Sequence, residues 1–94
     1  MEDTYFWREA KMSMTNIDRY AQDMGKTIWH NIEAERKRKS IDVQSLCKQA
    51  EISESVYYVH CRTAKRKTNM PDTSIDAIDR ICHVLNKPLS YFMS

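Results

Sequence analysis

Hydrophobic residues recur along most of this chain at intervals of three and four positions, which is the period of a helix with one buried face. The most regular stripe begins at Ile75 and ends at Leu85. The Asn-Lys-Pro sequence at 86–88 follows it directly, and proline does not continue a helix. The pattern therefore predicts a helix over 75–85, followed by a short apolar segment at 89–92 that folds back on the core.

An earlier stripe, over residues 17–32, predicts the first helix of the chain. It follows Thr15, a residue type favoured at helix N-caps, and leads into the basic run at 36–39, where cations suit the helix dipole. Gly25 interrupts the stripe at a cost of about 1 kcal/mol relative to alanine. The pattern predicts either one long helix or two helices that divide near Gly25.

Two short helices are predicted in the middle of the chain. Asp42 is the N-cap of the first, whose apolar stripe ends at Ala50. Ser53 is the N-cap of the second, which runs toward the basic residues at 62–67. Only residues 51–53 separate the two helices, and this is the length of a helix-turn-helix corner. A loop is expected over 68–74, where asparagine, proline and aspartate gather.

The composition agrees with an all-α fold of five helices, counting the N-terminal one. One glycine and two prolines in 94 residues are too few for the turns of a β-sandwich or barrel, and they exclude glycine-rich phosphate loops. We divide the chain into an N-terminal arm, 1–25, and one domain, 26–94. The predicted core consists of ten residues from the stripes: Ile28, Ile32, Leu46, Ala50, Ile52, Tyr57, Ile78, Ile81, Cys82 and Leu85.

Positive charge is concentrated in the middle third of the chain. Residues 36–67 contain nine lysines and arginines against three acids, whereas the rest of the chain is net negative. A basic surface of this kind is typical of nucleic-acid binding. We expect phosphate contacts from two runs and one glutamine: Arg36, Lys37, Arg38, Lys39, Gln44, Arg62, Lys65, Arg66 and Lys67.

The sequence gives little support for disulfide bonds, a metal site or catalysis. The three cysteines are odd in number and contain no C-x-x-C pair, which favours a reducing, cytoplasmic compartment. His60-Cys61 and Cys82-His83 resemble a zinc ligand set, but neighbours on a helix diverge by about 100° and rarely share a metal. We expect no metal, no cofactor, no enzymatic activity, no signal peptide and no membrane span.

Two stretches resemble the Cro/CI-repressor-type (XRE-like) helix-turn-helix family. Residues 46–55, LCKQAEISES, look like its signature Leu-Ala-x-x-Ala-Gly-Ile-Ser-x-Ser, and residues 71–90 look like its closing helix. The chain departs from the family at Val43, where glutamine is usual, at Glu51, where a small residue such as glycine is usual, and at 61–63, where Glu-x-Gly is usual. Without that last glycine, the third helix is expected to run on toward Thr68.

The resemblance implies a lambda-repressor-like domain whose third helix enters the major groove of double-stranded DNA. Matched position by position, five residues would face the bases: Ser53, Glu54, Ser55, Tyr58 and Val59. Serine hydroxyls donate or accept hydrogen bonds, and a glutamate accepts from the amino group of cytosine. Ser53 can serve as a helix cap at the same time.

The N-terminal arm carries more aromatic and sulfur-containing residues than a small domain needs. Trp29 follows not far beyond it. These side chains predict either packing within the chain or an interface with a second copy or another protein, and we favour a homodimer. A further alternative is that the arm is helical only in part and that residues 1–12 are disordered. The expected dimer residues are Tyr5, Phe6, Trp7, Met14 and Tyr20.

The function expected from these features is sequence-specific transcription regulation, as by a phage- or plasmid-type repressor that binds a palindromic operator as a dimer. The alternative is a helix-turn-helix module that binds a protein or RNA partner. The departures from the family pattern favour this alternative modestly.

Overall fold

The computed structural model describes residues 16–66, 68–71 and 75–94. This part of the chain forms five helices and contains no strand, which confirms the all-α class. The helices are α2 (Asn16–Arg38), α3 (Val43–Ala50), α4 (Glu54–Ala64), α5 (Ile75–Leu85) and α6 (Leu89–Phe92).

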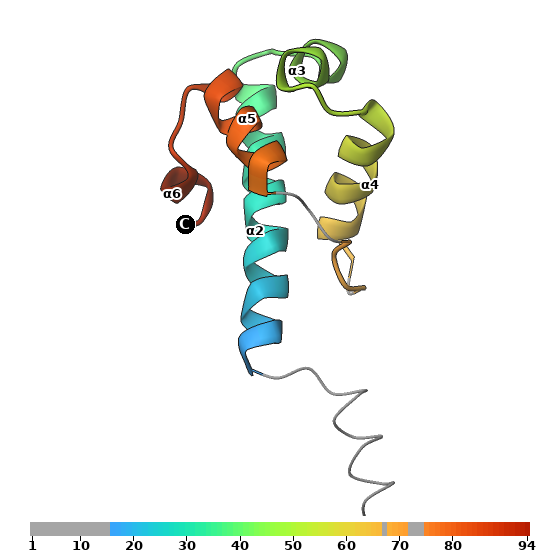
Figure 1. The fold of residues 1–94 in the computed structure, drawn as a ribbon, viewed down its shortest axis with the longest axis vertical. Coiled ribbons are helices and arrows are strands. Elements are labelled where there is room, and N and C mark those ends of the chain that lie inside the picture. Colours follow the sequence, from blue (N-terminus) through green and yellow to red (C-terminus); the bar gives the residue numbers. More distant parts are fainter. Residues whose placement is uncertain (1–15, 67, 72–74) are drawn as a thin grey trace, which may run out of the picture.

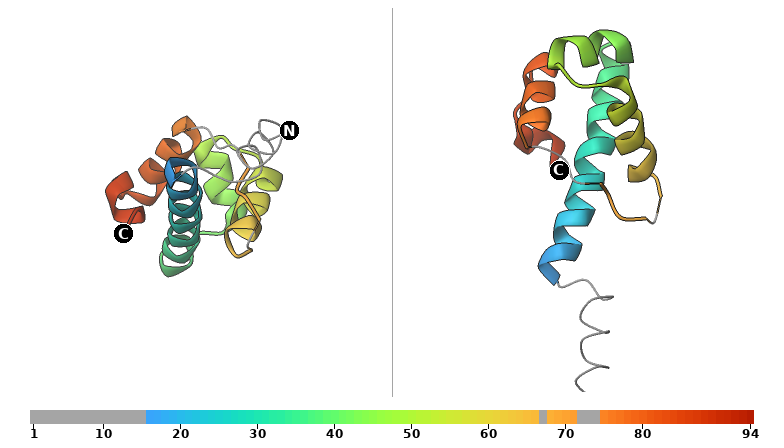
Figure 2. Two further views of the ribbon diagram at one scale, coloured as in Figure 1. Left: turned by 90° about the horizontal axis from the view of Figure 1, so that it is seen from below. Right: turned by 45° about the vertical axis from the view of Figure 1, so that its right-hand side comes forward.

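The long helix α2 forms the axis around which the other helices pack (Figure 1). It continues through Gly25 without a break, so the alternative of two helices divided there is excluded. α3 lies across the C-terminal end of α2, and α4 runs back along one side of it (Figure 1). Seen from below in Figure 2 (left), α4 lies on one side of α2, with α5 and α6 on the other. The division of the chain after residue 25 falls within α2 and stays a prediction.

The core fills the space between α2 and the four shorter helices. Eight of the ten predicted core residues are buried, and the other two, Ile52 and Ile78, are half-buried and pack against them. Phe92 is buried as well, so the segment at 89–92 does fold back on the core as predicted, whereas the burial of Met70, in the expected loop, was not predicted. Ile75, the first residue of the clearest stripe, is 75% exposed because α5 only begins there.

For Trp29 the structure decides between packing within the chain and an interface with a partner. Its side chain packs within the chain and is 1% exposed. Its ring meets Tyr57 edge-on with 5.6 Å between centroids and lies 4.7 Å from the ring of His60. Burying an indole contributes more apolar area than most other side chains, so Trp29 is a major contact between α2 and α4.

Three of the helices end in the same pattern of backbone hydrogen bonds. Beyond α2, α3 and α5, the residues Ser40, Glu51 and Asn86 take positive φ angles of 57°, 58° and 56°. At each end, this residue donates to the carbonyl three positions back and the next residue donates to the carbonyl five positions back. This is the Schellman motif, which pairs carbonyls that a helix end would otherwise leave unpaired.

Candidate nucleic-acid interface

The corner between α3 and α4 is built from local signals. The Asp42 carboxylate accepts a 2.9 Å hydrogen bond from the Ser45 amide and starts α3. The Ser53 hydroxyl accepts a 3.0 Å bond from the Val56 amide and starts α4. Both predicted N-caps are therefore confirmed. Between them the left-handed conformation of Glu51 turns the chain, so α4 leaves the corner alongside α2 (Figure 1).

One side of α4 is fixed against α2 by buried side chains. Tyr57 and His60 are buried there, and both rings contact Trp29. The Nδ1 atom of His60 lies 2.8 Å from the carbonyl oxygen of Val56, one turn earlier in the same helix. These contacts determine which side of α4 remains for a partner.

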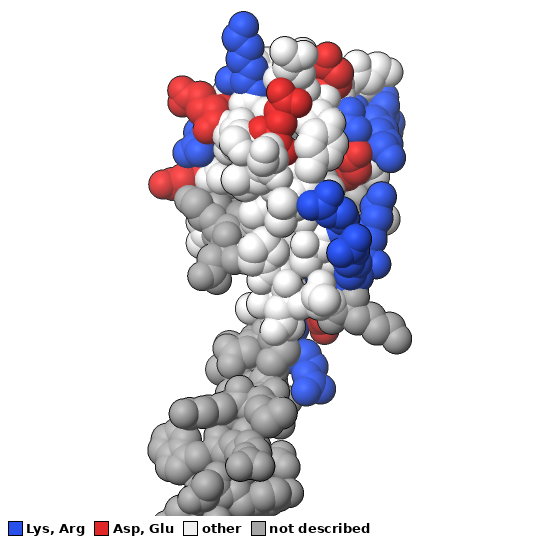
Figure 3. All heavy atoms as spheres, turned by 90° about the vertical axis from the view of Figure 1, so that its right-hand side faces the viewer, with Lys and Arg blue, Asp and Glu red and all other residues white. Residues whose placement is uncertain are grey.

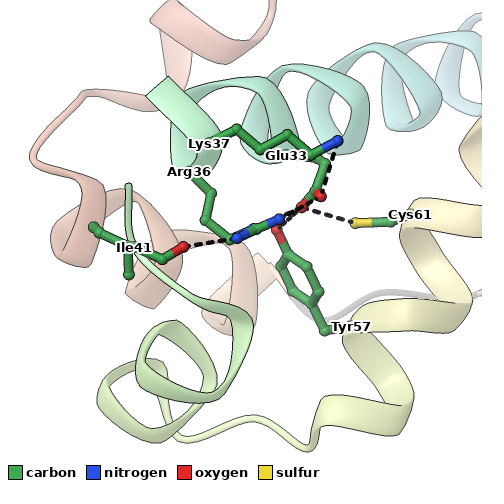
Figure 4. Close-up of polar contacts among 6 residues, drawn as sticks. All are labelled: Glu33, Arg36, Lys37, Ile41, Tyr57 and Cys61. Carbon is green, nitrogen blue, oxygen red and sulfur yellow. Dashed lines mark hydrogen bonds and ion pairs between the residues drawn. The ribbon is translucent and has the colours of Figure 1, made fainter. Parts of the chain in front are cut away.

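A polar network adds to this attachment (Figure 4). The Tyr57 hydroxyl donates a 2.7 Å hydrogen bond to Glu33, and the Arg36 guanidinium donates bonds of 2.9 and 2.6 Å to the same carboxylate. Arg36 also donates to the carbonyl of Ile41, which holds the chain between α2 and α3. The Cys61 sulfur lies 4.0 Å from Glu33. The network therefore joins α2, α4 and the turn that follows α2.

The network changes the pKa values of its members. Burial opposes ionisation of Glu33, but hydrogen bonds from Arg36 and Tyr57 outweigh it and lower the pKa of that carboxyl. Burial and the bond to Glu33 raise the pKa of Tyr57. Burial raises the pKa of the Cys61 thiol to about 11, so this cysteine is a poor nucleophile at neutral pH.

The other side of α4 faces solvent and carries the residues expected to read bases. Glu54 and Ser55 are exposed in its first turn, while Tyr58 is 50% exposed and Val59 is 39% exposed. Ser53 is exposed at the start of the helix, where its hydroxyl serves as the cap. The structure thus brings the five residues together at the corner end of α4. Gln44 is exposed near the start of α3.

The basic run at 36–39 is divided by the structure. Arg36 is enclosed with Glu33, and its side chain is only 13% exposed. Arg38 donates bonds of 3.0 and 2.5 Å to Glu35, and Lys39 donates to the carbonyl of Leu85 and lies 3.8 Å from Glu35. Lys37, at 3.7 Å from Glu33, keeps a side chain that is 63% exposed.

Glu33 and Glu35 therefore balance two of the four positive charges of this run within α2. Glu33 and Glu35 lie immediately before this run in the sequence. Residues three and four apart are neighbours on a helix, so the sequence EAERKRK at 33–39 already indicated these pairs. Arg36 and Lys39 are largely enclosed by these contacts, whereas Arg38 keeps a side chain that is 61% exposed, so phosphate binding by this run stays a prediction.

The far end of α4 corrects a second expectation. The helix ends at Ala64 and does not run on toward Thr68. The chain must return to α2 because Met70 is buried there and its amide donates a 2.6 Å hydrogen bond to Gln22. Arg62, Lys65 and Arg66 are exposed, whereas Lys67 lies outside the described residues.

Comparisons with known proteins add no relatives. No family model, no curated protein and no solved structure matches this chain. The chemistry of the surface is therefore argued from its own residues.

Among the residues expected in a dimer interface, only Tyr20 lies in the described part of the chain. It is 64% exposed and borders a mostly apolar cleft of about 400 Å³ between α2 and the start of α5, with Ala21, Met24, Pro71, Ile75 and Ile78 among its other lining residues. Tyr5, Phe6, Trp7 and Met14 lie outside the described residues.

The described residues contain no group of three or more His, Cys, Asp or Glu placed to hold a metal ion, and none of their helices is long and apolar enough to cross a membrane.

Proposed function

We propose that this protein is a sequence-specific DNA-binding transcription regulator, a repressor of the lambda-repressor-like helix-turn-helix class. The observation that carries the proposal is the way in which α4 packs against α2. One side of this helix is fixed to α2 by Trp29, Tyr57 and Glu33, and the other side, beginning at the Ser53 cap, is exposed. In the proposed complex, the first turns of α4 would enter the major groove with this exposed side toward the bases.

The roles of the exposed residues follow from their positions. Ser55 and Glu54 extend from the first turn, where side chains reach base edges, and Tyr58 offers its ring or its hydroxyl. Arg62, Lys65 and Arg66 lie at or beyond the other end of the helix, where phosphates are the expected partners. The resemblance of residues 46–55 to the Cro/CI-type signature supports the same assignment.

A homodimer on a palindromic operator completes the proposal. One domain contacts too few base pairs for specificity in a genome, and two-fold symmetry doubles the site. The two copies of α4 would then lie about 34 Å apart, one turn of B-DNA. Three free cysteines, of which Cys47 and Cys82 are buried, agree with the proposed cytoplasmic location.

The test is selection of a binding sequence from random duplex DNA, followed by affinity measurements on the selected site. Glu54→Gln should change the preferred base at one position by about 1–3 kcal/mol, since glutamine pairs with adenine and glutamate with cytosine. Asp79→Asn on α5 is the matched control, because it also removes one exposed negative charge and lies away from α4. If both variants raise the affinity for every duplex equally, Glu54 acts only through its charge and does not read a base.

The alternative proposal is that α4 binds a protein or RNA partner. Val56, Tyr58 and Val59 expose 46%, 50% and 39% of their surface on this helix. Glu54 places negative charge in its first turn, and Glu51 adds another at the corner before it. Apolar and acidic groups of this kind suit a protein surface better than a phosphate backbone. Absence of binding to any duplex below about 10 μM at low salt would favour this alternative.

A further inference from the structure

A basic surface crosses the boundary between α2 and α4, and residues from both sides form it. Lys26 and Lys37 come from α2, and Lys65 and Arg66 follow directly after α4. The Lys26 ammonium donates a 2.6 Å hydrogen bond to the carbonyl oxygen of Arg66, although 40 residues separate them. This bond holds the chain beyond α4 against the side of α2. We call Lys26, Lys37, Arg62, Lys65 and Arg66 the α2–α4 seam.

A cleft of about 200 Å³ lies within the seam. Buried Trp29 and half-buried Cys61 line it, together with the exposed side chains of His30, Lys37 and Lys65. The two lysines come from different helices and border the same cleft. The cleft has room for one phosphate group with water around it.

The net charge that the seam presents to solvent is positive. Glu33 also lines the cleft, but its carboxylate accepts hydrogen bonds from Arg36 and Tyr57. The Arg36 guanidinium therefore balances its negative charge. On the face that Figure 3 shows, lysine and arginine side chains gather on the right-hand side with an acidic group among them, whereas acidic and basic side chains are mixed toward the top and left.

We propose that the α2–α4 seam binds the phosphate backbone of one strand of duplex DNA. This inference rests on the proposed function and deepens it, because it names the part of the surface that holds the backbone. Lys26, Lys65 and Arg66 lie at the C-terminal end of α4, about 16 Å from the Ser53 cap for a helix of eleven residues. Lys37 lies toward the other end, because it is about three turns beyond Lys26 in α2 and pairs with Glu33, which bonds to Tyr57 near the start of α4. The seam therefore follows the side of α4 next to α2, whereas the residues proposed to read bases lie on its solvent side.

The seam also differs from the phosphate set expected from the sequence. It includes Lys26, which lies well outside the basic middle third. It leaves out Arg36, which is enclosed with Glu33, and it leaves out Arg38 and Lys39, which pair with Glu35 and Leu85 on the side of α2 that faces α5 and α6. Phosphate contacts supply affinity that falls with salt, by nearly one unit of logarithmic slope for each phosphate neutralised. Replacing one seam lysine should therefore change the salt slope of the affinity by a measurable amount.

The experiment measures the affinity of the full chain for a mixed-sequence duplex of about 20 base pairs, between about 50 and 200 mM salt, by fluorescence anisotropy. Lys26→Gln and Lys37→Gln should each lower the salt slope by about one unit, and the double variant by about two. Lys87→Gln is the matched control, since Lys87 lies beyond α5 with its ammonium 4.7 Å from the Tyr91 ring centroid. Circular dichroism confirms that each variant is folded.

The outcomes separate the seam from the proposed function. If the unaltered chain binds duplex DNA and both seam variants keep its salt slope, the seam is overturned and the proposed function stands. If binding depends on the seam but prefers no sequence, and a single strand of equal length binds equally well, the seam stands and sequence-specific regulation fails. If neither duplex nor single strand binds at the lowest salt, both proposals are overturned.

Discussion

Glu51 turns the chain from α3 toward α4 with a φ of 58°, in the left-handed region. A side chain with a Cβ costs about 1–2 kcal/mol in this conformation, and glycine avoids that cost. Glycine also gives the unfolded chain more freedom, which offsets part of the gain. Glu51→Gly should therefore raise the free energy of unfolding by about 0.5–1 kcal/mol in urea denaturation. Glu51→Ala retains the Cβ and is the control; an equal gain in both variants would contradict this account.

Glu35 predicts how stability responds to acid. It is buried, and hydrogen bonds from Arg38 and Tyr91 lower the pKa of its carboxyl from 4.5 to about 2. Since the folded state holds the proton less tightly than the unfolded state, this contribution to stability is complete above pH 4.5 and is lost as the pH falls toward 2. Glu35→Gln should flatten the dependence of urea midpoints on pH over this window. An unchanged profile would show that other carboxyls dominate.

At the scale of helices, α3 depends on a few apolar contacts, because it has only eight residues. Leu46 is fully buried in its middle and belongs to the core cluster. Leu46→Ala removes that contact and leaves a cavity, so it should lower the free energy of unfolding by about 2–5 kcal/mol in thermal or urea denaturation. Leu89→Ala is the control, because Leu89 is 39% exposed and leaves no enclosed cavity. Equal losses in the two variants would mean that Leu46 is not central to the core.

The three Schellman motifs also belong to the scale of helices, because each one ends a helix. They place the turns after α2, α3 and α5 without using the single glycine of the chain, which lies inside α2. A Cβ at Gly25 would meet only the Met70 side chain at 3.7 Å, so the helix does not require glycine there. The chain has residues with a Cβ where left-handed turns favour glycine, and glycine where a helix favours alanine.

At the scale of the whole molecule, the cleft beside Tyr20 bears on the predicted homodimer. Tyr20 and Ile75 are exposed apolar side chains at its border, and aromatic residues are enriched at protein interfaces. Tyr20→Asp should weaken dimerisation at least about tenfold in sedimentation equilibrium, because it places a charge where an apolar surface would be buried. Leu89→Asp, on α6, is the control for an exposed apolar side chain elsewhere, since Leu89 is 39% exposed. A monomer at high concentration, free and on DNA, would contradict the dimer.

Local signals in the sequence determined most of the fold. The spacing of apolar residues located the helices, and Asp42 and Ser53 located the starts of α3 and α4. Eight core residues were identified in the same way. These features depend on a residue and neighbours within about one helical turn, so the sequence contains all that is needed. The ion pairs within residues 33–39 also join near neighbours in the sequence, so they too could have been predicted, although our sequence-based prediction treats residues 36–39 as unpaired positive charges.

Only the tertiary structure decided which surfaces meet. It buried Trp29 between α2 and α4, and it ended α4 at Ala64 because Met70 returns to the core. It also joined Lys26 to the carbonyl of Arg66, which created a basic surface from two distant segments. Periodicity shows that a helix has an apolar face but not which element covers it, because that choice depends on the packing of the whole chain. The fold class was therefore accessible from the sequence, whereas the seam was accessible only from the structure.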